Sequence, residues 1–85
     1  NYSVLVGGVE AGLKAREFEV LRLLASYPGQ VFTHRAIYEE VWGGGSPGGE
    51  NAVAVYIKRI REKIEQDPRH PAHLITVWGV GYKLE

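Results

Sequence analysis

The segment NAVAVYIKRIREKIEQ, residues 51–66, contains the repeat of apolar residues that decides the fold. Apolar residues spaced four, three and four positions apart share one side of an α-helix: Val53, Ile57, Ile60 and Ile64. The opposite side carries an amide, a small aliphatic group and two cations: Asn51, Val55, Lys58 and Arg59. Cations suit phosphates, whereas the other two groups suit base edges and the thymine methyl. The segment therefore predicts a helix that is buried on one face and reads DNA with the other.

A β-hairpin is predicted after this helix, in ITVWGVGYKLE, residues 75–85. Its strands are expected at residues 75–78 and 82–84, around the turn Gly79-Val80-Gly81. Before it, Asp67-Pro68 and His70-Pro71 end the helix, because each proline disfavours helical angles at the preceding residue.

Two further helices are expected upstream. The first spans residues 15–27 and ends at Pro28-Gly29, with these residues toward the core: Phe18, Leu21, Leu24 and Ala25. A brief strand at residues 31–32 precedes Thr33, whose hydroxyl can cap a second helix over residues 34–42. Ile37 and Val41 of that helix are expected to face inward.

The two remaining segments are a hairpin and a loop. Residues 2–6 and 9–13 predict a small N-terminal hairpin around Gly7-Gly8, and the glycine-rich run over residues 43–50 predicts an exposed loop. The expected fold class is α+β, a winged helix-turn-helix: a three-helix core with a small N-terminal β-hairpin and a C-terminal β-hairpin wing.

Length and composition limit the number of domains and the kinds of environment that are expected for this chain. The 85 residues suffice for one domain, residues 1–85, and no apolar run approaches the ~18 residues that span a bilayer, so no membrane contact is expected. Cysteine is absent, so the core must rest on packing without disulfides, and a cytoplasmic location is expected. Methionine is also absent, even at the first position, so we expect a further domain upstream.

The charges are unevenly distributed although the formal net charge is zero. Residues 1–50 hold four cationic and six acidic side chains, whereas residues 51–64 hold four cationic ones and a single acidic one. The positive charge is therefore concentrated on the helix that is predicted to read DNA.

The chain resembles the winged-helix output domain of bacterial response regulators of the OmpR/PhoB family. The resemblance covers nearly everything from Leu13 onward and rests on a set of motifs: LKAREFEVLRLL, VFTHRAIYEEVWG, VAVYIKRIREKIE, and DPRHP followed by ITVWGVGY. Together these motifs are highly specific.

The resemblance implies roles for individual residues. Helix 51–66 would enter the major groove with Val55, Arg59 and Asn51 at base edges, and the wing over residues 75–84 would lie on the backbone and minor groove, with Trp78 at its tip. Phosphate contacts are implied for six residues: Trp42, Tyr56, Lys58, Arg61, Thr76 and Tyr82. The loop implied to contact RNA polymerase consists of Gly43, Gly44, Gly45, Ser46, Pro47, Gly48, Gly49 and Glu50.

The resemblance also implies partners. These are double-stranded DNA with direct repeats, RNA polymerase, an upstream receiver domain and a cognate histidine kinase of a two-component system. The isolated domain is expected to be a monomer that forms a tandem dimer on DNA.

This sequence departs from the family pattern at four places. Helix 51–66 usually opens with an arginine and a threonine, where Asn51 and Ala52 stand, and a frequent aspartate is replaced by Ala54, so fewer phosphate contacts are expected. Trp78 replaces the arginine that commonly reaches into the minor groove. Glycine fills most of the loop at residues 43–50, and the N-terminal sheet is expected to be short.

Simpler interpretations remain open. The cations of helix 51–66 could form only a solvated face, and Trp42 could be a core aromatic as readily as a phosphate contact; Trp78 is expected to be exposed. His70 and His73 are better read as surface residues than as metal ligands. No catalytic residues or cofactor are expected, because neither a nucleophile triad nor a phosphate-binding loop is present. A winged helix that binds only proteins remains the alternative function.

Overall fold

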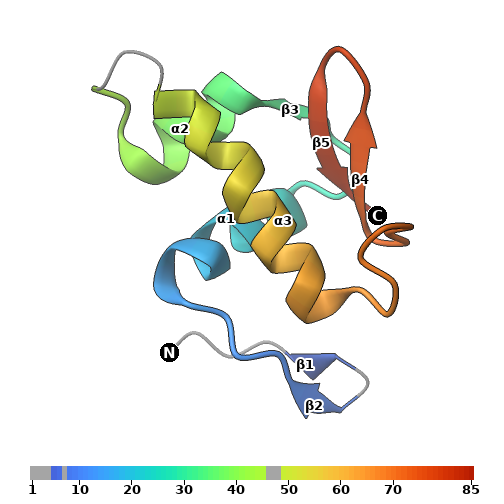
Figure 1. Ribbon diagram of the computed structural model, residues 1–85. Helices are drawn as coiled ribbons and strands as arrows, with labels where there is room; N and C mark the ends of the chain where they lie inside the picture. The colour runs from blue at the N-terminus through green and yellow to red at the C-terminus, as the bar shows by residue number, and fades with distance from the viewer. Residues whose placement is uncertain (1–4, 7, 46–48) are drawn as a thin grey trace.

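The computed structural model describes residues 5–6, 8–45 and 49–85, which form three α-helices and two small antiparallel sheets (Figure 1). The elements, in chain order, are β1 (Leu5–Val6), β2 (Val9–Glu10), α1 (Ala15–Ser26), β3 (Phe32–Thr33), α2 (His34–Trp42), the 3₁₀ turn η1 (Gly49–Asn51), α3 (Ala52–Ile64), β4 (Leu74–Val77) and β5 (Gly81–Leu84). This arrangement confirms the predicted winged helix-turn-helix.

The core lies between the three helices and the wing. The predicted stripe of α3 is confirmed, since Val53, Ile57 and Ile60 are at most 1% exposed and pack with residues of α1, α2 and β4: Val20, Leu21, Leu24, Ile37 and Leu74. Two side chains of α1 that were expected in the core are not fully buried. Phe18 is only half-buried at the edge of the core, and Ala25 is exposed.

Local signals place the helix boundaries. The Thr33 hydroxyl accepts a hydrogen bond from the backbone N–H of Ala36 at 3.0 Å, as predicted for the cap of α2. At the other end of α2, Gly43 adopts a left-handed φ of 78°, which glycine adopts without strain.

The loop predicted over residues 43–50 is irregular only in part. Its last two described residues open the η1 turn, so α3 begins at Ala52 rather than at Asn51. A Cβ added to Gly49 would lie 2.3 Å from the ring of Tyr38. Because this ring packs directly against the backbone, Gly49 is half-buried rather than exposed. Residues 46–48 lie outside the described part of the chain.

The wing is formed by β4 and β5, and β5 also pairs with β3, giving the strand order β3-β5-β4. In the turn between β4 and β5, the backbone N–H of Val80 donates to the carbonyl of Val77 at 3.0 Å. Gly81 lies opposite Thr33, and a Cβ there would lie 2.0 Å from the Phe32 carbonyl oxygen. The close approach of β3 to the wing therefore depends on glycine at this position.

The N-terminal hairpin is shorter than predicted. Among the described residues, β1 pairs with β2 in the register Leu5 with Glu10 and Val6 with Val9. The chain leaves the strand after Glu10 and turns at Gly12, whose φ is 71°. This turn brings Leu13 into the core, so the predicted strand over residues 9–13 is wrong beyond Glu10. Residues 1–4 and 7 of the predicted hairpin lie outside the described residues.

An ion pair joins α1 to α3 at the edge of the core. The carboxylate of Glu17 is 2% exposed and accepts hydrogen bonds from Lys63 Nζ at 2.5 Å and from the backbone N–H of Lys14 at 3.0 Å. Burial raises the pKa of Glu17, but the contacts with Lys63 and Lys14 outweigh it and hold the pKa below its usual value. Lys63 therefore neutralises a buried acid and adds little to the positive face of α3.

Candidate nucleic-acid interface

The face of α3 opposite the core is exposed, as the sequence predicts. Asn51, Val55, Lys58 and Arg59 are all exposed. Val55 keeps 48% of its surface in contact with solvent, so its aliphatic side chain is available to a partner. This face combines an apolar contact with cationic and amide groups, the combination that suits the edges and backbone of a DNA duplex.

Aromatic rings continue this face from α3 onto α2. The guanidinium carbon of Arg59 lies 5.2 Å from the centroid of the Tyr56 ring, and the ring of Trp42 meets Tyr56 edge-on at 5.1 Å. The guanidinium carbon of Arg16 in α1 also lies 5.4 Å from the centroid of the Trp42 ring, and Nη1 of Arg16 donates to the carbonyl of Val41 at 2.7 Å. Trp42 is thus half-buried and supports the base of the exposed face.

Arg61 connects α3 to the wing. Its Nε and Nη2 donate to the carbonyl oxygen of Leu74 at 3.0 and 2.8 Å, and Nη2 also donates to the hydroxyl of Thr76 at 2.8 Å. Its guanidinium carbon also lies 5.7 Å from the centroid of the Tyr82 ring. The phosphate contact implied for Arg61 stays a prediction. Its Nη1 group would make that contact, because Nε and Nη2 already donate hydrogen bonds to the wing.

The two wing residues with implied phosphate contacts already have partners inside the domain. Tyr82 is buried, and its hydroxyl lies 3.1 Å from Nε2 of His34. Thr76 is half-buried and receives the hydrogen bond from Arg61. Their phosphate contacts also stay predictions, and the structure assigns both residues a part in positioning the wing.

Glu65 secures the start of the wing, a role that the sequence pattern did not reveal. Its buried carboxylate accepts hydrogen bonds from the backbone N–H groups of Ala72, His73 and Leu74 at 2.7 to 3.3 Å. Charged acceptors make the stronger hydrogen bonds in proteins. The end of α3 is therefore tied to the first residue of β4.

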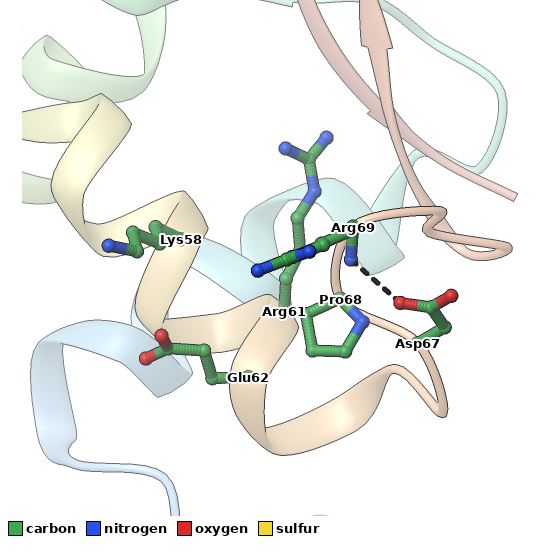
Figure 2. Close-up of a pocket in the computed structure, with 6 residues that line it drawn as sticks. All are labelled: Lys58, Arg61, Glu62, Asp67, Pro68 and Arg69. Atoms are coloured by element: carbon green, nitrogen blue, oxygen red, sulfur yellow. Dashed lines mark hydrogen bonds between the residues drawn. The ribbon is translucent and has the colours of Figure 1, made fainter.

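A depression of about 550 Å³ lies between the C-terminal half of α3 and the loop that follows (Figure 2). Its lining consists of Lys58, Arg61, Glu62, Asp67, Pro68 and Arg69. A second depression of about 360 Å³ adjoins it toward the wing and shares Arg61, Pro68 and Arg69. We call the two together the α3–wing groove. The sequence pattern did not reveal Arg69 as a candidate, because a single arginine in a loop has no periodicity.

Trp78 occupies the wing turn and is 89% exposed, as expected from its position in the hairpin. Val80, two residues later, is 51% exposed. The wing therefore presents an apolar tip next to a cationic groove.

The glycine-rich loop implied to contact RNA polymerase is described only at its two ends. Gly43, Gly44 and Gly45 follow α2, and Gly49 with Glu50 opens η1. The carboxylate of Glu50 lies 3.6 Å from Nη1 of Arg35, which holds this end of the loop against α2. Ser46, Pro47 and Gly48 lie outside the described residues.

Within residues 5–6, 8–45 and 49–85, the acidic, histidine and cysteine side chains form no cluster of three that could hold a metal ion. His70 instead lies 3.0 Å from the carboxylate of Asp67 in the exposed loop after α3. In the same part of the chain, no helix has the length and apolarity needed to cross a bilayer.

An exposed cationic helix face beside an anchored hairpin defines a winged-helix domain of the type found in transcription regulators. Residues 8–84 match the family described as "Transcriptional regulatory protein, C terminal". The chain belongs to this family, in its OmpR/PhoB branch, which is a family of regulators rather than of enzymes.

Known members of the family are similar over nearly the whole chain. The uncharacterized transcriptional regulatory protein YcbL of Bacillus subtilis is 44% identical over 84 residues, which are 99% of this chain and 37% of YcbL. The response regulator DrrB of Thermotoga maritima, an OmpR/PhoB homologue, superposes with a TM-score of 0.87 at 38% identity, over 96% of this chain and 37% of DrrB. The chain thus spans little more than a third of these two relatives.

A third relative was solved with a nucleic acid bound. The DNA-binding domain of Klebsiella pneumoniae RstA, in complex with the RstA box, superposes with a TM-score of 0.86 at 29% identity, covering 96% of this chain and 81% of the RstA domain.

Proposed function

We propose that this chain is the sequence-specific, double-stranded-DNA-binding output domain of a two-component response regulator that controls transcription. α3 lies in the major groove, the wing lies on the backbone and minor groove, and the loop at residues 43–50 faces RNA polymerase. The exposed face of α3, with Arg59, Lys58 and Val55 beside an anchored wing, carries this proposal. The likeness to the RstA domain bound to its box supports it.

Family membership supports the proposed setting. Residues 1–85 form a single cytoplasmic DNA-binding domain preceded by a receiver domain, which a cognate histidine kinase phosphorylates. The share of YcbL and DrrB that this chain leaves uncovered provides room for a receiver domain. Two copies bind direct repeats side by side, which raises avidity without new contacts to each site.

Arg59→Ala is expected to relax sequence preference by about tenfold or more, because a bidentate arginine–guanine contact is worth roughly 1 to 3 kcal/mol of discrimination. The measurement is the affinity ratio between a duplex selected from a random pool and the same duplex with single base changes. Arg59→Lys is the matched control, since it keeps the charge and loses the planar fork. An unchanged ratio in Arg59→Ala would remove Arg59 from base reading.

Lys58→Gln is expected to weaken binding to all sequences alike and to reduce the slope of log affinity against log salt by about one, because one phosphate contact is lost. Arg22→Gln, which removes an exposed cation of α1, serves as the control and should leave the slope unchanged. A loss confined to particular sequences would contradict the phosphate assignment. If the wild-type domain bound its partners without steep salt dependence, the protein-binding alternative would be favoured.

A further inference from the structure

The tip of the wing is apolar where a charged contact with the minor groove would be expected. Trp78 projects almost entirely into solvent, and Val80, two residues later in the same turn, is about half exposed. Large apolar side chains gathered in the open usually mark a contact surface. The turn is held by the hydrogen bond between Val77 and Val80, so this apolar pair stands on an ordered support.

Cations lie next to this tip, in the part of the α3–wing groove nearest the wing. Trp78 lines that part together with Arg61, Arg69 and Thr76. Figure 2 shows the Arg69 side chain extending from the loop toward α3. The backbone N–H of Arg69 donates to the Asp67 carboxylate at 3.1 Å, which fixes the loop that carries this guanidinium. One hollow therefore has cationic walls and an aromatic ring at its rim.

We propose that Arg69 holds a DNA backbone phosphate in the α3–wing groove and that Trp78 enters the adjacent minor groove as an apolar wedge. Apolar side chains that contact sugars or unstack a base step are a known means of minor-groove binding, and guanidinium groups suit phosphates. The charge that Trp78 cannot supply at the tip is then supplied by Arg69 from the neighbouring loop. This inference rests on the proposed function and assigns two further contacts to it.

The arrangement of charge favours a DNA strand over a second copy of the chain as the occupant. The lining of the groove includes three cations, Lys58, Arg61 and Arg69, against Glu62 and Asp67, and Asp67 is already engaged by His70 and by the loop backbone. A nucleic-acid strand presents phosphates together with sugar and base surfaces, and so matches both the guanidinium groups and the ring.

The test uses the domain itself with a duplex, selected from a random pool, that carries one binding site. Trp78→Ala should weaken binding about tenfold with an unchanged salt slope, because stacking is an uncharged contact. Trp78→Phe should retain most of the affinity. Arg69→Gln should lower the salt slope by about one, as expected for a lost phosphate contact, whereas Arg22→Gln should not.

Fluorescence provides a second measurement. The emission of Trp78, obtained as the difference between the wild type and Trp78→Phe, should become protected from a soluble quencher when the duplex is added. Thermal melts of all variants should coincide with that of the wild type, because Trp78, Arg69 and Arg22 are all exposed.

Three outcomes would overturn the inference. They are wild-type affinity in Trp78→Ala, a Trp78 emission that stays accessible on DNA, and a loss of affinity that occurs only on duplexes with two sites, which would assign Trp78 to a contact between copies. In each of them the wild type still binds DNA, so the proposed function survives. A wild type that binds no duplex at low salt would refute both.

Discussion

Ile57→Ala is expected to lower the free energy of unfolding by about 2 to 5 kcal/mol, the cost of truncating a large aliphatic side chain in a packed core. Ile57 is 1% exposed and lies at the centre of the α3 stripe, between Val53 and Ile60. The helix that presents the proposed DNA-reading face is therefore held in place largely by this side chain and its neighbours. Denaturant unfolding followed by circular dichroism measures the change.

Val55→Ala is the matched control, because it truncates an aliphatic side chain of the same helix on the exposed face. Its effect on stability should stay within about 0.5 kcal/mol, as is usual for exposed positions. Equal effects of the two substitutions would contradict the assignment of a buried and an exposed face, and a larger effect of Val55→Ala would show that the two faces of α3 have been exchanged.

Lys63→Met is expected to lower the free energy of unfolding by about 3 kcal/mol at neutral pH, because it leaves the buried carboxylate of Glu17 without its cation. The double variant Glu17→Gln/Lys63→Met removes the uncompensated charge and should regain part of this loss. The double variant thus separates the penalty of a lone buried charge from the loss of packing. A single variant as stable as the wild type would show that the pair contributes nothing.

The effect of Lys63→Met should depend on pH. Because the pKa of Glu17 in the folded state lies below its value in the unfolded chain, about 4.3 for glutamate, the carboxylate contributes stability above that pH. This contribution is lost as the pH falls through the folded-state pKa. The difference between the wild type and Lys63→Met should therefore shrink as the pH falls from neutral to about 4 and below, because Glu17 without its cation takes up a proton at a higher pH than Glu17 of the wild type. Unfolding free energies measured along a pH series can detect this change.

Much of the fold could be predicted because its main elements repeat or have strong local signals. The stripe of α3 recurs with helical spacing, Thr33 caps α2, and the prolines after α3 stop the helix. How deeply a side chain is buried, and which groups pack closely together, could not be predicted in this way. Periodicity placed Ala25 toward the core although it is exposed, and the glycine-rich loop gave no sign that Gly49 packs against the ring of Tyr38.

The candidate site also has one part that could be predicted from the sequence and one part that could not. The exposed face of α3 could be predicted because it is the complement of the buried stripe. The partners of the two half-buried cations of α3 could not, because they come from distant parts of the chain. Lys63 pairs with a residue 46 positions away, and Arg61 bonds to residues 13 and 15 positions away. Only the tertiary structure shows which cations are engaged inside the domain.

The bonds from Arg61 to Leu74 and Thr76 give α3 and the wing a fixed separation. A duplex bound in the proposed way must place its major and minor grooves at that separation. Any bending of the duplex, or narrowing of its minor groove, is then a deformation of the DNA and not of the domain. Stiff and flexible base-pair steps differ in how much free energy such bending costs. Base pairs that touch no side chain would thereby contribute to the choice of operator through their mechanical properties.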